Sequence, residues 1–333
     1  MSLVSLWLRS QILTMRPVLS RFDVKAGRLA QDQLGKLGVR VLSSTVEYTE
    51  ANGFSATQAC MARRRAALPT GEGVAARGVI LYLHGGGYVA GGLEYAKLYG
   101  GVLAAGSGLP VLCLAYALAP EHPYPAAMED ALLAYGRLMG QGYAARQIVI
   151  AGESAGGGLA LGLMHRLKAF GLPLPAGLIC ISPWTDLTLS SASLRYNARH
   201  DVSLTVRQLR YFADCYAPED VTQPEISPAL GSFAGFPPAL VYAGGDEILL
   251  DDARAVLRGY RAAEVPCRMF IQKGMWHAWP LYPTPESGKA LAHMVAFMGR
   301  CLALAEADRE VSPQITKNPQ IFCDSRHKEA DDG

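Results

Sequence analysis

The sequence predicts an α/β fold, in which strands and helices alternate around a mostly parallel central sheet. The chain has 333 residues and half of them are hydrophobic, which is enough for a sizeable core. Segments of helical pattern separate short apolar runs of buried-strand length. These runs are residues 79–83, 109–116, 148–151, 177–182, 239–243 and 267–272. Functional side chains are expected at the carboxyl ends of such strands.

Composition excludes several classes of function. The net charge of +2 gives no electrostatic case for binding nucleic acid or an acidic partner. The seven cysteines form no C-x-x-C pair, and neither a zinc-ligand spacing nor a P-loop motif occurs. We therefore expect free thiols in a reducing, cytoplasmic compartment, and neither a metal nor an organic cofactor. No apolar run reaches transmembrane length.

The N-terminal segment, residues 1–22, has apolar residues at amphipathic helical spacing, with Arg9 and Arg16 between them. Arg9 interrupts the apolar run and no cleavage site follows, so we do not expect a signal peptide. We predict a helix laid over an active site. Contact with a membrane surface is the alternative.

A G-x-S-x-G motif follows the strand at 148–151. It is formed by Gly152, Glu153, Ser154, Ala155 and Gly156, and a helical pattern comes after it. Strand, sharp turn and helix are the setting of a nucleophile elbow, in which small flanking residues tolerate a strained serine. The motif alone would also fit an ordinary tight turn, since 35 glycines make chance matches easy.

A glycine-rich loop follows the strand at 79–83. Its sequence is His84, Gly85, Gly86, Gly87 and Tyr88. Such a loop can bring backbone N–H groups close to a ligand. We predict that the N–H groups of Gly85 and Gly86, with that of Ala155, form an oxyanion hole. His84 is predicted to pin the loop rather than to act as a base.

An acid and a base follow the last two strands. Asp246 comes after the strand at 239–243 and His277 after the strand at 267–272, which gives the order serine, acid, histidine. Asp251 and Asp252 compete as the acid, but they fall inside the next helix, so Asp246 is preferred. Farther upstream, Glu121 and His122 lie in a proline-rich stretch that predicts a rigid structural turn, with Glu121 hydrogen-bonded locally.

Together these motifs resemble the hormone-sensitive lipase family of bacterial esterases and lipases (family IV), within the α/β-hydrolase superfamily. The resemblance covers about residues 79–300 and rests on five stretches in order: 84–87, 116–123, 152–157, 182–187 and 246–252. It implies an α/β-hydrolase fold, hydrolysis of carboxylic esters of short to medium acyl chains, a helical cap and, in many members, a homodimer.

Two departures from the family pattern concern the site. Glu153 stands where the family commonly has aspartate, and its longer side chain is expected to change either the contacts at the elbow or the substrate preference. Trp276 and Trp279 flank His277 and are heavier than the family's usual residues, so we expect them to narrow the pocket.

The predicted domain organisation has five segments. They are N-terminal cap helices at 1–38, a first core part at 39–187, a cap insertion at 188–226, a second core part at 227–305, and a disordered tail at 306–333.

The predicted chemistry is acyl transfer from a small-molecule ester to the hydroxyl of Ser154, which forms a covalent acyl-enzyme intermediate. His277 would take the serine proton and Asp246 would orient the imidazole. An amidase or acyltransferase could use the same triad, because pocket shape decides the leaving group. A non-catalytic ligand receptor on the same scaffold is disfavoured, since all three triad members are present.

Overall fold

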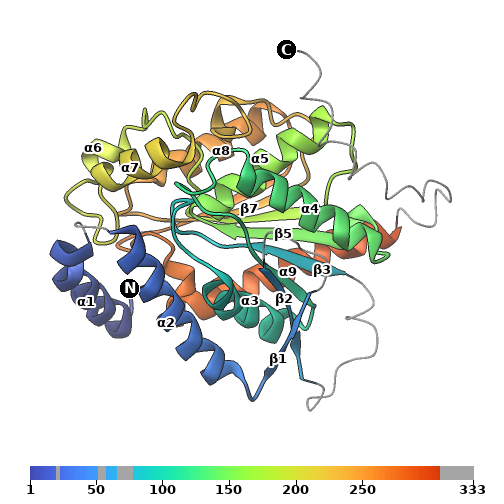
Figure 1. Ribbon diagram of the computed structural model, residues 1–333, viewed down its shortest axis with the longest axis horizontal. Coiled ribbons are helices and arrows are strands. Elements are labelled where there is room, and N and C mark those ends of the chain that lie inside the picture. The colour runs from blue at the N-terminus through green and yellow to red at the C-terminus, as the bar shows by residue number, and fades with distance from the viewer. Residues whose placement is uncertain (20–22, 52–57, 66–77, 308–333) are drawn as a thin grey trace.

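A single eight-stranded sheet organises the computed structural model, which describes residues 1–19, 23–51, 58–65 and 78–307 (Figure 1). The strand order is β1-β2-β4-β3-β5-β6-β7-β8. The β1–β2 and β2–β4 pairs are antiparallel and the remaining pairs are parallel. The predicted mostly parallel sheet is therefore confirmed. The strand bounds are β1 (Val46–Glu50), β2 (Gln58–Arg64), β3 (Val79–Leu83), β4 (Val111–Ala115), β5 (Ile148–Glu153), β6 (Gly177–Ile181), β7 (Ala239–Gly244) and β8 (Cys267–Gln272).

The central strands are covered on both faces. Every residue of β3, β5, β6 and β7 is buried, which is typical of parallel strands between two helical layers. The helices of these layers are α3 (Leu93–Ser107), α4 (Ala126–Gly140), α5 (Ala155–Ala169), α8 (Leu250–Ala262) and α9 (Pro285–Ala307). One core cluster packs against α4, α5 and α8, and the other against α3 and α9.

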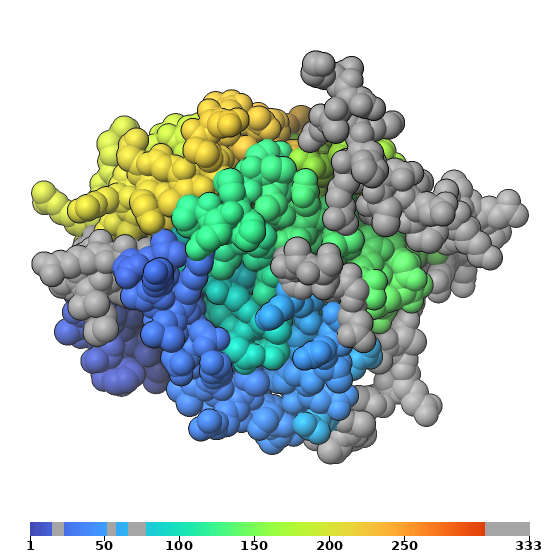
Figure 2. Space-filling view, in the orientation of Figure 1, coloured from blue at the N-terminus to red at the C-terminus, as the bar shows by residue number. Residues whose placement is uncertain are grey.

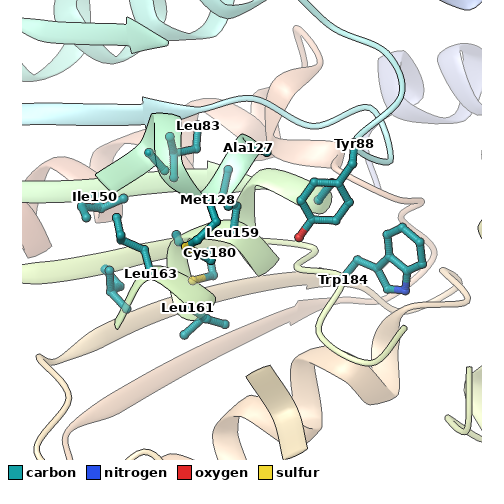
Figure 3. Packing of buried hydrophobic residues seen from close by; sticks show 14 of the residues in the cluster. Leu83, Tyr88, Ala127, Met128, Ile150, Leu159, Leu161, Leu163, Cys180 and Trp184 are labelled. Carbon is teal, nitrogen blue, oxygen red and sulfur yellow. The ribbon is translucent and has the colours of Figure 1, made fainter. Parts of the chain in front are cut away.

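Figure 3 shows part of the first cluster. Side chains from the strands lie against side chains from α4 and α5, and Tyr88 and Trp184 lie toward one end of this packing. The labelled residues of the strands are Leu83, Ile150 and Cys180, and those of the helices include Met128, Leu159 and Leu163. This dense packing fixes the strand ends that carry the candidate site.

Four further helices lie toward one side of the sheet (Figure 1). They are α1 (Leu3–Leu19), α2 (Val24–Leu42), α6 (Ser193–Tyr196) and α7 (Val206–Tyr216). Three short 3-10 helices complete the described elements: η1 (Ala145–Gln147), η2 (Pro228–Leu230) and η3 (Trp279–Leu281). No described helix has the length and apolarity needed to cross a membrane.

Two boundaries differ from the sequence prediction. The helical N-terminal segment continues to Leu42 instead of ending at 38, so the first extended segment begins only at Val46. Val39 and Val41 fit a strand pattern by residue type, yet they continue α2, which packs closely on α3 through Gly35 and Gly38. The division into cap and core segments stays a prediction, and the predicted tail lies outside the described residues beyond Ala307.

The cysteines of the described residues are all free. They are Cys60, Cys113, Cys180, Cys215, Cys267 and Cys301, and Cys323 lies outside the described residues. The expectation of free thiols is confirmed for these six positions.

Candidate active site

Ser154 occupies a strained turn between β5 and α5. Its backbone has φ 56° and ψ −123°, a conformation that side-chain-bearing residues rarely adopt. The glycines of the motif allow this turn, since a Cβ atom on Gly156 would lie 2.1 Å from the carbonyl oxygen of Leu83. A Cβ atom on Gly152 would lie 2.3 Å from the carbonyl oxygen of Gly156. The structure thus has the elbow that the G-x-S-x-G motif predicts.

The glycine-rich loop lies directly beside this serine. A Cβ atom built on Gly85 would be 3.0 Å from the Cβ of Ser154. The N–H of Gly85, however, donates to the carboxylate of Glu153 at 2.5 Å. Gly85 therefore cannot serve as the oxyanion donor that the sequence suggested. Sequence reasoning missed this because the competing acceptor belongs to a residue 68 positions away.

Three backbone N–H groups remain for an oxyanion. In the part of the chain that the structure describes, no hydrogen bond uses the N–H of Gly86, Gly87 or Ala155. Gly86 and Gly87 have φ of 118° and 63°, and Ala155 is the first residue of α5. The N-terminus of α5 adds its partial positive charge at the same place. The arrangement suits an anion next to Ser154.

His84 is structural, as predicted. It is fully buried, its Nδ1 donates to the carbonyl of Gly85 at 2.7 Å, and its ring stacks on Tyr116 with centroids 4.3 Å apart. Burial lowers the pKa of this imidazole to about 4, despite the opposing hydrogen bond to Gly85. A neutral histidine that holds the loop follows from these contacts.

Glu153 links the elbow to the loop. Its buried carboxylate accepts hydrogen bonds from the Tyr82 hydroxyl and from the Gly85 N–H, each at 2.5 Å. Burial raises the pKa of this carboxyl to about 7, although both hydrogen bonds act to lower it. The glutamate therefore positions the loop beside the nucleophile, and the effect of glutamate in place of aspartate stays a prediction.

The acid beside His277 is Glu247, which corrects the prediction of Asp246. Nδ1 of His277 lies 3.3 Å from Oε2 of Glu247, and both side chains are buried. The Asp246 carboxylate instead lies 2.9 Å from Arg9 of α1. Side chains of consecutive residues leaving a strand point to opposite sides, so only one of the two acids can face the imidazole. Glutamate can also serve as the triad acid in this order, but the motif does not distinguish Glu247 from Asp246.

The charges around His277 favour its protonated form. Burial alone would lower the pKa of the imidazole, but the contact with Glu247 raises it, and the charges of Asp201 and Glu153 add to this effect. The net result is a pKa above the usual 6.5. For Glu247 the effects are opposite: burial raises the pKa of the carboxyl, and the contact with His277 acts to lower it.

Residues of the predicted cap insertion hold the acid turn. Nδ2 of Asn197 donates to the carbonyl oxygens of Gly245 and Glu247, at 3.1 and 2.8 Å. The buried Asp201 accepts the N–H of Ile248 at 2.8 Å. Asn197 and Asp201 are site residues that sequence reasoning missed, since no motif marks either of them.

The backbone of Ser154 and the loop that carries His277 both contact the end of β6. The N–H of Ser154 donates to the carbonyl of Ile181 at 2.8 Å, and the N–H of Ala278 donates to the hydroxyl of Ser182 at 2.9 Å. Ile181 and Ser182 are consecutive, so the serine and the histidine loop flank one strand end. Within the described residues no hydrogen bond joins the Ser154 hydroxyl to the imidazole, and such contacts often tighten only around a substrate.

The competing acids and the proline-rich turn have structural roles. Asp252 accepts the N–H groups of Thr185 and Asp186, at 2.8 and 2.9 Å, and burial raises its pKa to about 7. Glu121 is bonded to Arg28 of α2, at 3.0 and 2.7 Å, rather than to a local partner as predicted.

The two tryptophans beside His277 belong to the core. Trp276 is fully buried and packs edge-on against Tyr282. The indole N–H of Trp279 donates to the carbonyl of Ala243 at 3.2 Å, and only 3% of its surface is exposed. Both lie in the cluster formed with α3 and α9, so they support the histidine loop from within the core.

Comparisons with known proteins show the family to which this fold belongs. Residues 80–281 match the alpha/beta hydrolase fold family. An acetyl-hydrolase of Streptomyces hygroscopicus is 39% identical over 222 residues, which is 66% of this chain and 74% of the relative. An esterase of Acinetobacter venetianus is 37% identical over 66% of this chain and 74% of its own.

Solved structures extend the likeness to most of the chain. EstE5, in a crystal soaked with p-nitrophenyl butyrate, has a TM-score of 0.77 and 31% identity, covering 88% of this chain and 98% of EstE5. An esterase described as a member of the bacterial hormone-sensitive lipase family has the same TM-score, identity and coverage. The chain therefore belongs to the α/β-hydrolase family, and within it to the bacterial hormone-sensitive lipase family.

Proposed function

We propose that this protein is a serine hydrolase that cleaves carboxylic esters of short to medium acyl chains. Ser154 is the nucleophile, His277 the general base and Glu247 the acid. The observation that carries the proposal is the strained serine, with φ 56°, set between a loop of unused N–H groups and the end of the β6 strand that also holds the histidine loop.

The names of relatives support the substrate class. Besides the acetyl-hydrolase and the esterase above, an ethyl acetate hydrolase of Pseudomonas putida is 34% identical over 218 residues. The butyrate ester in the EstE5 crystal is also short. Both point to small acyl groups for this chain.

The reaction begins when His277 takes the proton of the Ser154 hydroxyl as its oxygen attacks the ester carbonyl. Glu247 holds the imidazole in one tautomer and stabilises its charged form. The N–H groups of Gly86, Gly87 and Ala155 stabilise the oxyanion, and each such donor contributes about 3 kcal/mol to the transition state.

The second half of the reaction repeats these steps with water. His277 gives its proton to the leaving alcohol, which departs and leaves an acyl group on Ser154. The neutral imidazole then takes a proton from a water molecule that attacks the acyl-enzyme. As the second tetrahedral intermediate collapses, His277 returns this proton to the oxygen of Ser154, which releases the carboxylic acid and restores the serine. The protein's own residues supply every step.

The setting of the enzyme is part of the proposal. A cytoplasmic location is supported by the six free cysteines of the described residues. A helical cap formed by α1, α2, α6 and α7 is supported by the contacts of Arg9, Asn197 and Asp201 with the acid turn. A homodimer rests on the family resemblance alone.

Replacement of Ser154 tests the proposal. Ser154→Ala should reduce hydrolysis of p-nitrophenyl esters about a millionfold, because the triad acts as a unit. Ser232→Ala, at an exposed serine away from the site, serves as the matched control and should keep wild-type turnover. Wild-type turnover in Ser154→Ala would contradict the proposal.

An acyl-chain series and a matched amide define the substrate class. Turnover should fall as the acyl chain lengthens beyond medium size, and the ester should react much faster than the amide of the same acyl group. Equal rates on the amide would instead indicate an amidase. A fluorophosphonate probe should label the wild type and not Ser154→Ala.

A further inference from the structure

Helix α1 exposes an apolar stripe to solvent, although its Leu8 and Ile12 pack against the core. Leu3 is 84% exposed and Trp7 is 61% exposed, and Leu6 and Leu13 on the same stripe are about half exposed. These positions follow the i, i+3, i+4 spacing of one helix face. In a water-soluble protein an amphipathic helix normally buries that face, so the orientation of α1 needs a reason.

Polar contacts on the inner face fix this orientation. Ser5 is fully buried and donates to the carboxylate of Glu286 at 2.8 Å, and Ser2 donates to the same carboxylate. Arg9 contacts Asp246 and donates to the carbonyl oxygens of Gly274 and His200. The helix could not rotate its leucines inward without breaking these contacts.

Helix α2 has exposed apolar side chains beside exposed basic ones. Leu29 is 61% exposed, Leu37 is 60% exposed and Val41 is 72% exposed. Lys25 and Arg40 are exposed on the same helix. The two helices occupy the same side of the molecule in Figure 1, and the blue surface of this segment faces the viewer in Figure 2. We call the exposed side chains of both helices the α1–α2 face.

The charge of this segment selects among the partners that an apolar face could have. Residues 1–42 contain seven Lys or Arg and two Asp, whereas the whole chain has a net charge of only +2. Arg9, Arg28 and Lys36 of this segment pair with carboxylates, and the exposed cations described on the face are Lys25 and Arg40. Two copies of a basic face repel one another when they meet, which disfavours a second copy of this chain as the partner. An anionic surface complements both the charge and the apolar residues.

Trp7 is suited to the same surface. The other three tryptophans of the chain, at 184, 276 and 279, are buried, and Trp7 alone among the four is exposed. Tryptophan prefers the boundary between headgroups and acyl chains, because one part of its ring is apolar and the other is polar.

We propose that the α1–α2 face binds the surface of an anionic lipid bilayer. The apolar side chains of α1 and α2 enter the headgroup region and the lysine and arginine side chains meet the lipid phosphates. The proposal goes beyond ester hydrolysis and concerns a surface outside the triad, so its test measures binding and does not depend on catalysis.

Vesicle binding tests the proposal with the full-length protein. Vesicles of equal parts phosphatidylcholine and phosphatidylglycerol should sediment the protein and shift Trp7 emission to shorter wavelength, and pure phosphatidylcholine should do so at least about fivefold less well. The double variant Leu3→Ser with Leu6→Ser should lower vesicle binding at least about tenfold while Trp7 stays available as the reporter. Each of Lys25→Gln and Arg40→Gln should weaken binding about fivefold.

Leu230→Ser is the matched control, because Leu230 is 51% exposed on η2 and belongs to neither helix. It should bind vesicles as the wild type does, and all variants should keep the wild-type unfolding temperature. The proposal is overturned if anionic vesicles neither sediment the protein nor shift Trp7 emission, or if Leu230→Ser weakens binding as much as the Leu3 and Leu6 changes. Protection of Trp7 from acrylamide without lipid, increasing with protein concentration, would also overturn it by showing self-association.

Discussion

Nδ1 of His277 lies 3.3 Å from Oε2 of Glu247. The preceding residue, Asp246, lies 2.9 Å from Arg9 of α1. Two consecutive acids thus have separate partners, one in the candidate triad and one in the N-terminal helix. Because their partners differ, replacing Glu247 and replacing Asp246 should affect activity to different extents.

Replacing each acid by its amide separates these roles. Glu247→Gln should lower kcat about ten-thousandfold, because an amide cannot stabilise the imidazolium and favours the wrong tautomer of His277. Asp246→Asn removes only the partner of Arg9 and should lower kcat less than about tenfold, with a loss of about 1 kcal/mol or less in unfolding free energy. Steady-state kinetics and urea unfolding of both variants check this.

The opposite pattern of kcat losses would contradict the assignment of Glu247 as the triad acid. A ten-thousandfold loss in Asp246→Asn with near-normal kcat in Glu247→Gln would make Asp246 the acid. Arg9→Gln is the control for the ion pair, and it should reproduce the small effect of Asp246→Asn.

The pH dependence of kcat/KM should report the raised pKa of His277. Only the neutral imidazole can take the serine proton, so activity falls as the pH drops through this pKa, which lies above 6.5. Although burial acts to lower the pKa, the contact with Glu247 raises it. In Glu247→Gln the acidic limb should therefore move to lower pH. An unmoved limb, measured from the residual activity, would show that Glu247 does not set this pKa.

Much of the fold and part of the site could be predicted from the sequence. The continuous apolar runs gave the buried strands β3, β5 and β7, since such runs are typical of parallel strands covered on both faces. The strained turn at Ser154 also followed from its glycines. The end of α2 at Leu42 could not be predicted, because Val39 and Val41 suit either a strand or a helix by residue type.

The acid and the oxyanion donors needed the tertiary structure. Which of two consecutive acids faces His277 depends on the direction of the turn after β7, and Asn197 and Asp201 fix that turn from about 50 residues away. Likewise, the N–H of Gly85 is unusable because the Glu153 side chain reaches it. Long-range contacts of this kind leave no local pattern in the sequence.

The buried carboxyl of Glu153 should make stability depend on pH. Its pKa is raised from 4.5 to about 7 by burial, so its favourable contribution is present below pH 4.5 and is lost as the pH rises through about 7. Glu153→Gln cannot titrate. The unfolding free energy of the wild type, relative to that of Glu153→Gln, should therefore fall by about 3 kcal/mol across this range. Urea unfolding on both sides of the range measures the change, and a constant difference would contradict the raised pKa.

Gly86 should be irreplaceable, because its φ is 118° and a Cβ atom there would lie 2.2 Å from the carbonyl oxygen of Ala90. Gly86→Ala must move the loop and displace its N–H, so kcat should fall about a hundredfold to a thousandfold. The matched control is Gly140→Ala, where a Cβ atom meets nothing within 4 Å. Gly140 ends α4, so alanine there should leave kcat unchanged and stabilise the fold by up to about 1 kcal/mol. Kinetics and thermal unfolding of the two variants check the contrast, and normal kcat in Gly86→Ala would exclude this loop from the oxyanion hole.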